Sequence, residues 1–169
     1  MIITEIESTP LEPVTLDEVK DHLGYAPDVK TYDDVLTRHI TASRQILERN
    51  LDIYITQRSV RFSPAAMPAP LPVPLVGIRS AKAKDAQGAE VDIEYEVLGD
   101  SELRRSLVWK LPEGCTEPTF TATVGFEQCP EDIRAAIVAL VKGRYDRVPI
   151  APLLEDAMMT LSAYRRVGI

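Results

Sequence analysis

Apolar residues follow two different periods along this chain, and the clearest change of period lies near residue 125. In residues 118–125 every second residue is apolar, with Phe120, Ala122 and Val124 on one side, which predicts a strand. After Pro130 the period becomes helical, and apolar residues recur at Ile133, Ile137, Leu140 and Val141. Proline is favoured at the first position of a helix, because its missing N–H has no partner to lose there. The pattern therefore predicts a strand followed closely by a helix over residues 130–145.

Three further helices are predicted. Thr15 and Glu18 have the spacing of a capping box, so a short helix should start there and end at Gly24. Residues 34–51 form a second helix with one apolar stripe, which consists of Leu36, Ile40, Ser43, Leu47 and Leu51. A last helix is expected from residue 153 to about residue 166. Residues 1–13 are expected to be extended and weakly ordered, since Pro10 and Pro13 delay any helix.

The middle of the chain has the two-residue period of strands. Together with residues 118–125, we expect about five strands, the others covering residues 53–62, 76–84, 89–98 and 102–111. Residues 64–74 are rich in proline and cannot form a helix or a central strand. A polyproline-like crossover or an edge segment is favoured there over a ligand for a proline-binding module.

These elements predict an α+β fold. We expect a helical core of about four helices, two N-terminal and two C-terminal, with an inserted small antiparallel sheet or barrel. The expected parts are residues 1–52 and 127–169 for the helical core and residues 53–126 for the β-rich insertion, in a single domain.

The charge distribution narrows the range of functions. The chain has 19 basic and 26 acidic residues, which gives a net charge of −7. Residues 1–34 contain nine acids and only two lysines, and residues 85–102 contain seven acids and no base. Tight, sequence-specific binding to duplex DNA needs a basic face, so this distribution argues against it. We expect no membrane span and no secretion signal, because no apolar run approaches 18 residues and the N-terminus is acidic.

No catalytic motif is present in the sequence. It lacks a glycine-rich phosphate loop, a nucleophile elbow, HExxH and CxxC, so we predict no enzyme activity and no cofactor. Cys115 and Cys129 are expected to be ordinary reduced thiols, and no metal site is predicted. Asp92, Glu94 and Glu96 alternate along one predicted strand. They could bind a hard cation, although a solvated strand face is the commoner explanation.

Basic residues on two predicted helices are candidates for contacts between proteins. Arg38, Arg44 and Arg49 lie off the apolar stripe of the second helix. They form either a solvated face or a surface that meets acids of a neighbouring subunit. Arg165 and Arg166 end the last helix, where cations complement the terminal carbonyl groups.

The chain resembles the head–tail connector (adaptor) proteins of tailed phages and of gene transfer agents. The resemblance spans residues 11–166 and keeps the family's order of segments. The matching segments are residues 13–23, 40–48, 55–57, 124–137 and 164–166.

The resemblance implies a structural virion protein at the head–tail junction, present in the host cytoplasm during assembly. It implies a ring, commonly of twelve subunits, between the portal protein and a tail-side or stopper protein, with DNA passing through the channel. Tyr164, Arg165 and Arg166 would lie in the region that engages the portal. Asp92, Glu94 and Glu96 are candidates for a channel lining that repels DNA phosphates. A small DNA-packaging or DNA-binding factor is the alternative, and it would need a basic surface.

Overall fold

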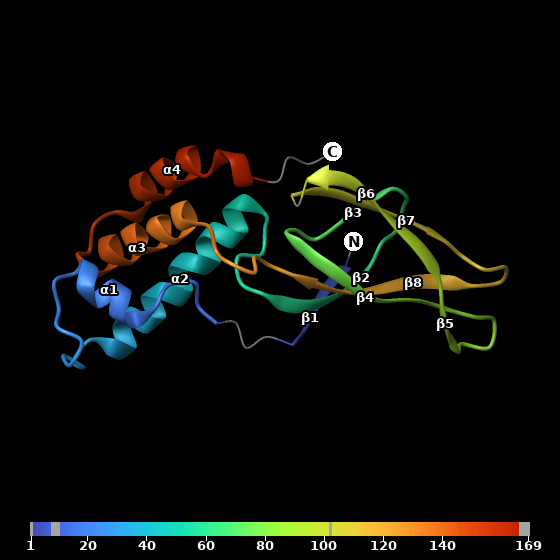
Figure 1. Ribbon diagram of the computed structural model, residues 1–169, viewed down its shortest axis with the longest axis horizontal. Coiled ribbons are helices and arrows are strands. Elements are labelled where there is room, and N and C mark those ends of the chain that lie inside the picture. The colour runs from blue at the N-terminus through green and yellow to red at the C-terminus, as the bar shows by residue number, and fades with distance from the viewer. Residues whose placement is uncertain (1, 8–10, 102, 166–169) are drawn as a thin grey trace. The chain divides into compact units, whose positions relative to one another are not determined.

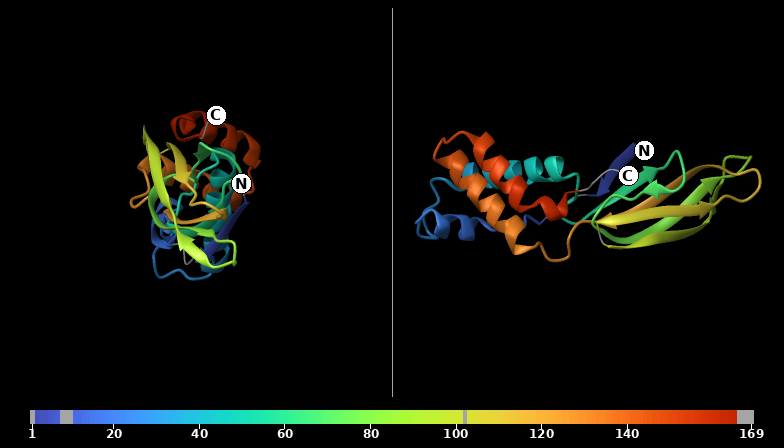
Figure 2. Two further views of the ribbon diagram at one scale, coloured as in Figure 1. Left: turned by 90° about the vertical axis from the view of Figure 1, so that its right-hand side faces the viewer. Right: turned by 90° about the horizontal axis from the view of Figure 1, so that it is seen from above.

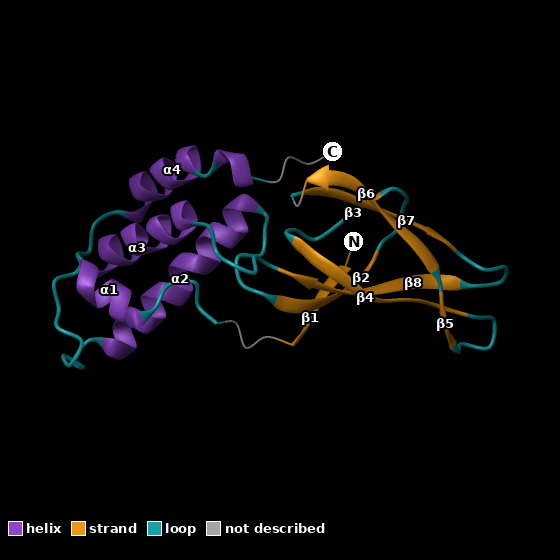
Figure 3. Cartoon of the chain, in the orientation of Figure 1, coloured by secondary structure: helices purple, strands orange, loops and turns teal. Residues whose placement is uncertain are grey.

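The computed structural model describes residues 2–7, 11–101 and 103–165 (Figure 1). Within these residues the chain forms two compact units. The helical unit comprises residues 11–55 and 128–165, and the sheet unit comprises residues 2–7 and 56–127. Figure 3 shows the helices of the first unit in purple and the strands of the second in orange. The α+β class predicted from the sequence is confirmed.

The helical unit contains four α-helices, which Figure 2 shows from two further sides. They are α1 (Leu16–His22), α2 (Asp33–Leu51), α3 (Glu131–Tyr145) and α4 (Ile150–Thr160), and the 3₁₀ turn η1 (Ser162–Tyr164) follows α4. α3 packs against each of the other three helices. The apolar stripe predicted for α2 is buried against α3 in a core that includes Leu36, Leu47, Leu51, Ile133, Ile137 and Leu140.

The ends of α1, α2 and α3 lie close to those predicted from the sequence. The capping box at α1 is present: the Glu18 N–H donates to Thr15 Oγ1 at 3.2 Å, and the Thr15 N–H donates to Glu18 Oε2 at 2.7 Å. Two details differ from the prediction. Pro130 precedes α3 instead of occupying its first position, with φ −55° and ψ 143°. The last helix starts at Ile150 and ends at Thr160, so the predicted range to residue 166 was wrong.

The sheet unit contains two antiparallel sheets. The five-stranded sheet has the order β1-β2-β8-β4-β5, and the three-stranded sheet has the order β3-β7-β6. The strands of the first sheet are β1 (Ile2–Glu7), β2 (Arg58–Ser63), β4 (Leu75–Lys84), β5 (Glu90–Asp92) and β8 (Thr116–Val124). Those of the second are β3 (Ala69–Pro70), β6 (Glu94–Ser101) and β7 (Arg104–Lys110).

Phe120 of the central strand β8 connects the cores of the two sheets. It lies opposite Phe62 of β2, and their rings stack with centroids 5.6 Å apart. From the other sheet, Tyr95 and Trp109 approach Phe120 edge-on, with centroid distances of 6.3 and 5.7 Å. Offset and edge-to-face arrangements of this kind are the favourable ones for aromatic rings.

Several strands differ from the sequence prediction. The structure has eight strands within its described residues, where about five were expected. Residues 89–98 do not form one strand: β5 and β6 belong to different sheets, and the chain passes from one to the other at Ile93. Residues 2–7 form a strand because they pair with β2, a partner that the local pattern could not reveal. The proline-rich segment supplies the edge strand β3, in agreement with one of its two expected roles.

We expect Gly125→Ala to destabilise the protein far more than Gly88→Ala. Both glycines have a positive φ, 103° and 84°, where an added Cβ costs about 1–2 kcal/mol. A Cβ at Gly125 would also overlap the backbone carbonyl of Thr56, whereas the space around Gly88 is open. Gly125→Ala should therefore lower the free energy of unfolding by about 3 kcal/mol or more. Equal losses in urea unfolding of the two variants would contradict this account.

Candidate assembly surfaces

Arg44 is buried inside the helical unit. Only 4% of the residue is exposed. Its Nε donates to Glu12 Oε2 at 2.8 Å, and its Nη1 donates to Glu48 Oε2, also at 2.8 Å. Burial alone would lower the pKa of Arg44, but the hydrogen bonds and charges of Glu12 and Glu48 outweigh it and raise the pKa. The expectation that Arg44 lies on a solvated face was therefore wrong.

The partners of Arg44 tie distant segments to α2. Glu12 lies in the segment before α1 and also accepts a hydrogen bond from the Thr41 hydroxyl at 2.8 Å. Glu48 accepts the backbone N–H of Ile55 at 2.8 Å, so it also holds the segment that follows α2. The sequence analysis missed this cluster. The Arg44–Glu48 spacing of four residues was a signal on the helix, but no local pattern indicated Glu12.

Arg38 and Arg49 are exposed on α2. Arg38 Nε donates to the Asp34 carbonyl of its own helix at 3.1 Å, and its guanidinium group remains at the surface. His39 follows Arg38 on the same helix. Its pKa lies below the ordinary value, because the side chain is partly buried and because Arg144 and Arg38 add positive charge nearby. The polar side of α2 is thus a cationic surface at Arg38 and Arg49, while Arg44 serves an internal role.

The three C-terminal residues predicted to engage the portal differ in their surroundings. The hydroxyl of Tyr164, in η1, donates to Asp132 Oδ1 in the first turn of α3 at 3.1 Å. Burial and this hydrogen bond raise the pKa of Tyr164. Arg165 is exposed, and Arg166 lies outside the described residues. The hydrogen bond of Tyr164 therefore links η1 to α3, and the exposed guanidinium group of Arg165 follows directly in the sequence.

The predicted row of acids is divided between two sheets. Asp92 lies in β5, opposite Lys82 of β4. Glu94 and Glu96 lie in β6, opposite Lys110 and Val108 of β7. All three carboxylates are exposed, but they do not share one strand face as predicted.

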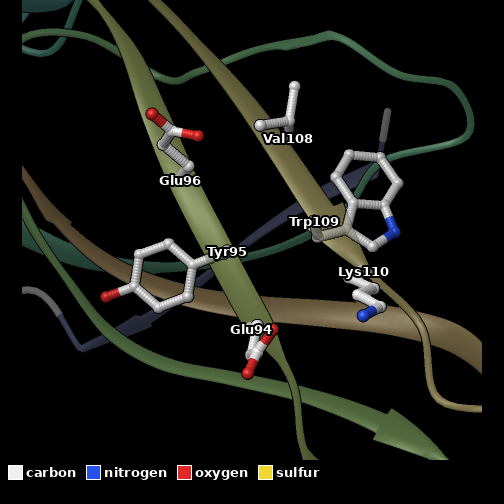
Figure 4. Close-up of a pocket in the computed structure, with 6 residues that line it drawn as sticks. All are labelled: Glu94, Tyr95, Glu96, Val108, Trp109 and Lys110. Carbon is white, nitrogen blue, oxygen red and sulfur yellow. The ribbon is translucent and has the colours of Figure 1, made fainter.

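Glu94 and Glu96 border a shallow hollow of about 320 Å³ on β6 and β7 (Figure 4). Glu94 and Lys110 lie near one end of it, and Glu96 and Val108 lie near the other. Tyr95 and Trp109 complete the lining. The hollow is thus lined by neighbouring residues of two paired strands.

Side chains that bind metal ions do not gather in the described part of the chain. There, no three His, Cys, Asp or Glu side chains are placed to hold a metal ion. Cys115 and Cys129 are free thiols. Burial and the nearby Asp132 and Glu131 raise the pKa of Cys129 to about 12, so its thiol stays protonated at neutral pH. Among the described helices, none combines the length and the apolar character needed to cross a bilayer.

Three solved structures with this fold come from gene transfer agent (GTA) particles. A chain of the neck of an empty GTA particle, computed with C6 symmetry, superposes with a TM-score of 0.78 at 20% identity, covering 100% of this chain and 97% of that chain. A chain of the native GTA virion gives 0.76 at 20% identity, and one of the native neck with C12 symmetry gives 0.71 at 19%, both with the same coverage. The chain shares its fold with GTA neck chains. No protein-family model and no curated protein sequence matches it.

Replacing Arg44 should destabilise the fold, whereas replacing Arg38 should not. Arg44→Met removes the guanidinium group that binds Glu12 and Glu48, so these partly buried carboxylates lose their ion pair, at a cost of about 2–3 kcal/mol. Arg38→Met removes a surface charge and should change stability by less than about 0.5 kcal/mol. Urea unfolding, monitored by circular dichroism, measures the free energy of unfolding of both variants. Similar midpoints for Arg44→Met and the unmodified protein would refute the structural role of Arg44.

In an NMR pH titration, the pKa of His39 should lie below its ordinary value of 6.5. The unfolded chain then binds the proton more readily than the folded one, so the His39 contribution to stability falls as the pH drops through 6.5 towards the folded pKa. Arg144→Met should raise the pKa of His39 only in part, because burial is the larger cause. Arg49→Met serves as the control and should leave it unchanged. A His39 pKa above 6.5 would contradict the structure.

Proposed function

We propose that this chain is a structural, non-enzymatic subunit of the neck of a phage-like particle. The observation that carries the proposal is the shared fold: the superposition with a GTA neck chain covers 100% of this chain and 97% of that one, at a TM-score of 0.78. The similarity is thus to a whole neck chain, with both units included. The segments that resemble connector proteins in the sequence support the same function without reference to the fold.

In this proposal, copies of the chain form a ring, and the ring lies between the portal protein and a tail-side or stopper protein. The neck structures were computed with C6 and C12 symmetry, and both symmetries are compatible with twelve subunits, the number we propose. DNA would pass through the channel without specific contacts, in keeping with the net charge of −7. The protein would be present in the host cytoplasm until it joins the virion.

A ring subunit needs two different surfaces that complement one another, because a head-to-tail contact closes only through a rotation. The helical unit offers the exposed cations Arg38 and Arg49 on α2. It also carries exposed carboxylates before and at the start of α2, at Asp28 and Asp34. We propose that the cations of one subunit face such carboxylates of the next. Arg165, together with Tyr164 and Arg166, is proposed for the portal contact.

Electron microscopy of the protein mixed with its portal tests this function. The unmodified protein should add a ring with rotational symmetry to portal particles in negative stain, compared with portal alone. Arg38→Glu with Arg49→Glu should abolish the ring while leaving the circular dichroism spectrum unchanged. Lys30→Glu with Lys142→Glu changes the charge equally elsewhere on the helical unit and should preserve the ring. A folded protein that adds no density to the portal would refute the proposed function.

A further inference from the structure

Two of the four sheet edges in the described residues are protected against pairing with another strand. The edge strand β3 has only two residues, and one of them is Pro70, which has no N–H to donate. The edge strand β5 has only three residues, Glu90–Asp92. Short edge strands and edge prolines are devices by which proteins avoid unwanted strand addition.

The other two edges, β1 and β6, lack this protection. They have six and eight residues, and neither contains a proline or a lysine. Each exposes large apolar side chains: Ile3 (37%) and Ile6 (45%) on β1, and Tyr95 (43%) and Leu98 (41%) on β6. A long edge strand with exposed apolar residues is a template for pairing with another chain.

The two unprotected edges belong to different sheets. β1 and β5 are the two outer strands of the five-stranded sheet. β6 follows β5 directly, after Ile93, whose N–H still donates to the Ala81 carbonyl of β4 at 3.1 Å. β6 therefore starts from the margin that is farthest from β1 in the strand order, as Figure 1 shows. Each copy thus has one unprotected edge in each of its two sheets, and the two edges differ in sequence.

We propose that neighbouring copies are joined by backbone pairing between β1 of one copy and β6 of the next. This inference rests on the proposed function, since it supplies a contact for the ring. Because the two edges differ, the contact is head-to-tail, and every copy uses each edge once. Such a contact continues until a rotation closes it into a ring, whereas a β1–β1 contact would stop at a two-fold dimer.

The side chains of β1 are arranged for this pairing. Ile3 lies opposite the core residue Phe62 of β2, and Glu5 lies opposite the core residue Val60, so both point to the apolar side of the sheet. Thr4, between them, points to the other side. Glu5 lies 3.8 Å from Arg58 Nη1, which offsets part of its charge.

The side chains of β6 complement this arrangement. Tyr95 points to the apolar side, where it meets Phe120, and Glu94 and Glu96 point to the opposite side. When the apolar sides of the two strands align, Glu94 and Glu96 lie on the side of the uncharged Thr4. The carboxylate of Glu5 falls on the other side, so the acids of the two strands do not oppose one another directly. Like charges placed directly opposite would have destabilised the pair.

Disulfide trapping tests the pairing and its register. In a Cys115→Ser, Cys129→Ser background, Thr4→Cys is combined in turn with Glu94→Cys, Glu96→Cys or Leu98→Cys, since all these positions share one side of the proposed joint sheet. Residues that face each other on two paired strands are close enough for a disulfide. After mild oxidation of the ring assembled on portal, at least one double variant should give a ladder of covalent dimers, trimers and larger species on a non-reducing gel.

The controls separate the possible failures. Each single variant should give no ladder, and Thr4→Cys with Asp92→Cys on the protected edge β5 should give none. Dimers from Thr4→Cys alone would indicate a two-fold β1 contact and overturn the inference. Rings without a ladder in any of the three double variants would overturn it as well, while leaving the proposed function intact. If the unmodified protein forms no ring on the portal, the proposed function itself fails.

Discussion

The sheet unit depends on the burial of Phe120 between its two sheets. Strand β8 is central in the five-stranded sheet, and Phe120 is fully buried at its middle. Its ring contacts Phe62 within the same sheet and Tyr95 and Trp109 from the other sheet. Replacing a buried phenylalanine by alanine typically costs about 3–5 kcal/mol. Phe120 packs there with other buried apolar side chains of the sheet unit, among them Phe62 and Leu107.

In the helical unit, a buried polar cluster around Arg44 has a role like that of Phe120 in the sheet unit. A buried guanidinium group is costly unless its donors are satisfied, and here Glu12 and Glu48 satisfy three of them. Because Glu12 and Glu48 also bind Thr41 and the Ile55 N–H, the cluster sets the path of the chain before α1 and after α2. The cluster therefore both stabilises the helical unit and positions α2, whose exposed side carries Arg38 and Arg49.

The two sheet edges proposed to join neighbouring copies share one physical property: no strand of the described sheets pairs with their outer side. The strands β1 and β6 have backbone edges without a partner strand in the described sheets, in contrast to the short β3 and β5. Exposed apolar side chains on a sheet edge are unfavourable for an isolated soluble protein, and pairing with another copy removes both costs. A building block of a larger particle is a protein in which such edges are expected. The function proposed from the GTA neck fold and the inference from the edges are thus consistent, although they rest on different observations.

Local sequence determined the parts of the structure that depend on nearby residues. The Thr15–Glu18 capping box, the apolar stripe of α2 and the alternation around Phe120 involve contacts or periods within a few residues, and the structure reproduces them. The candidate function was also indicated by the sequence, but by a resemblance and not by any catalytic group. Tertiary structure alone decided the division of residues 89–98 between two sheets, the strand β1 and the burial of Arg44. These features require partners far away in the chain, such as Glu12, which lies 32 residues from Arg44, and no local pattern can specify partners at that separation.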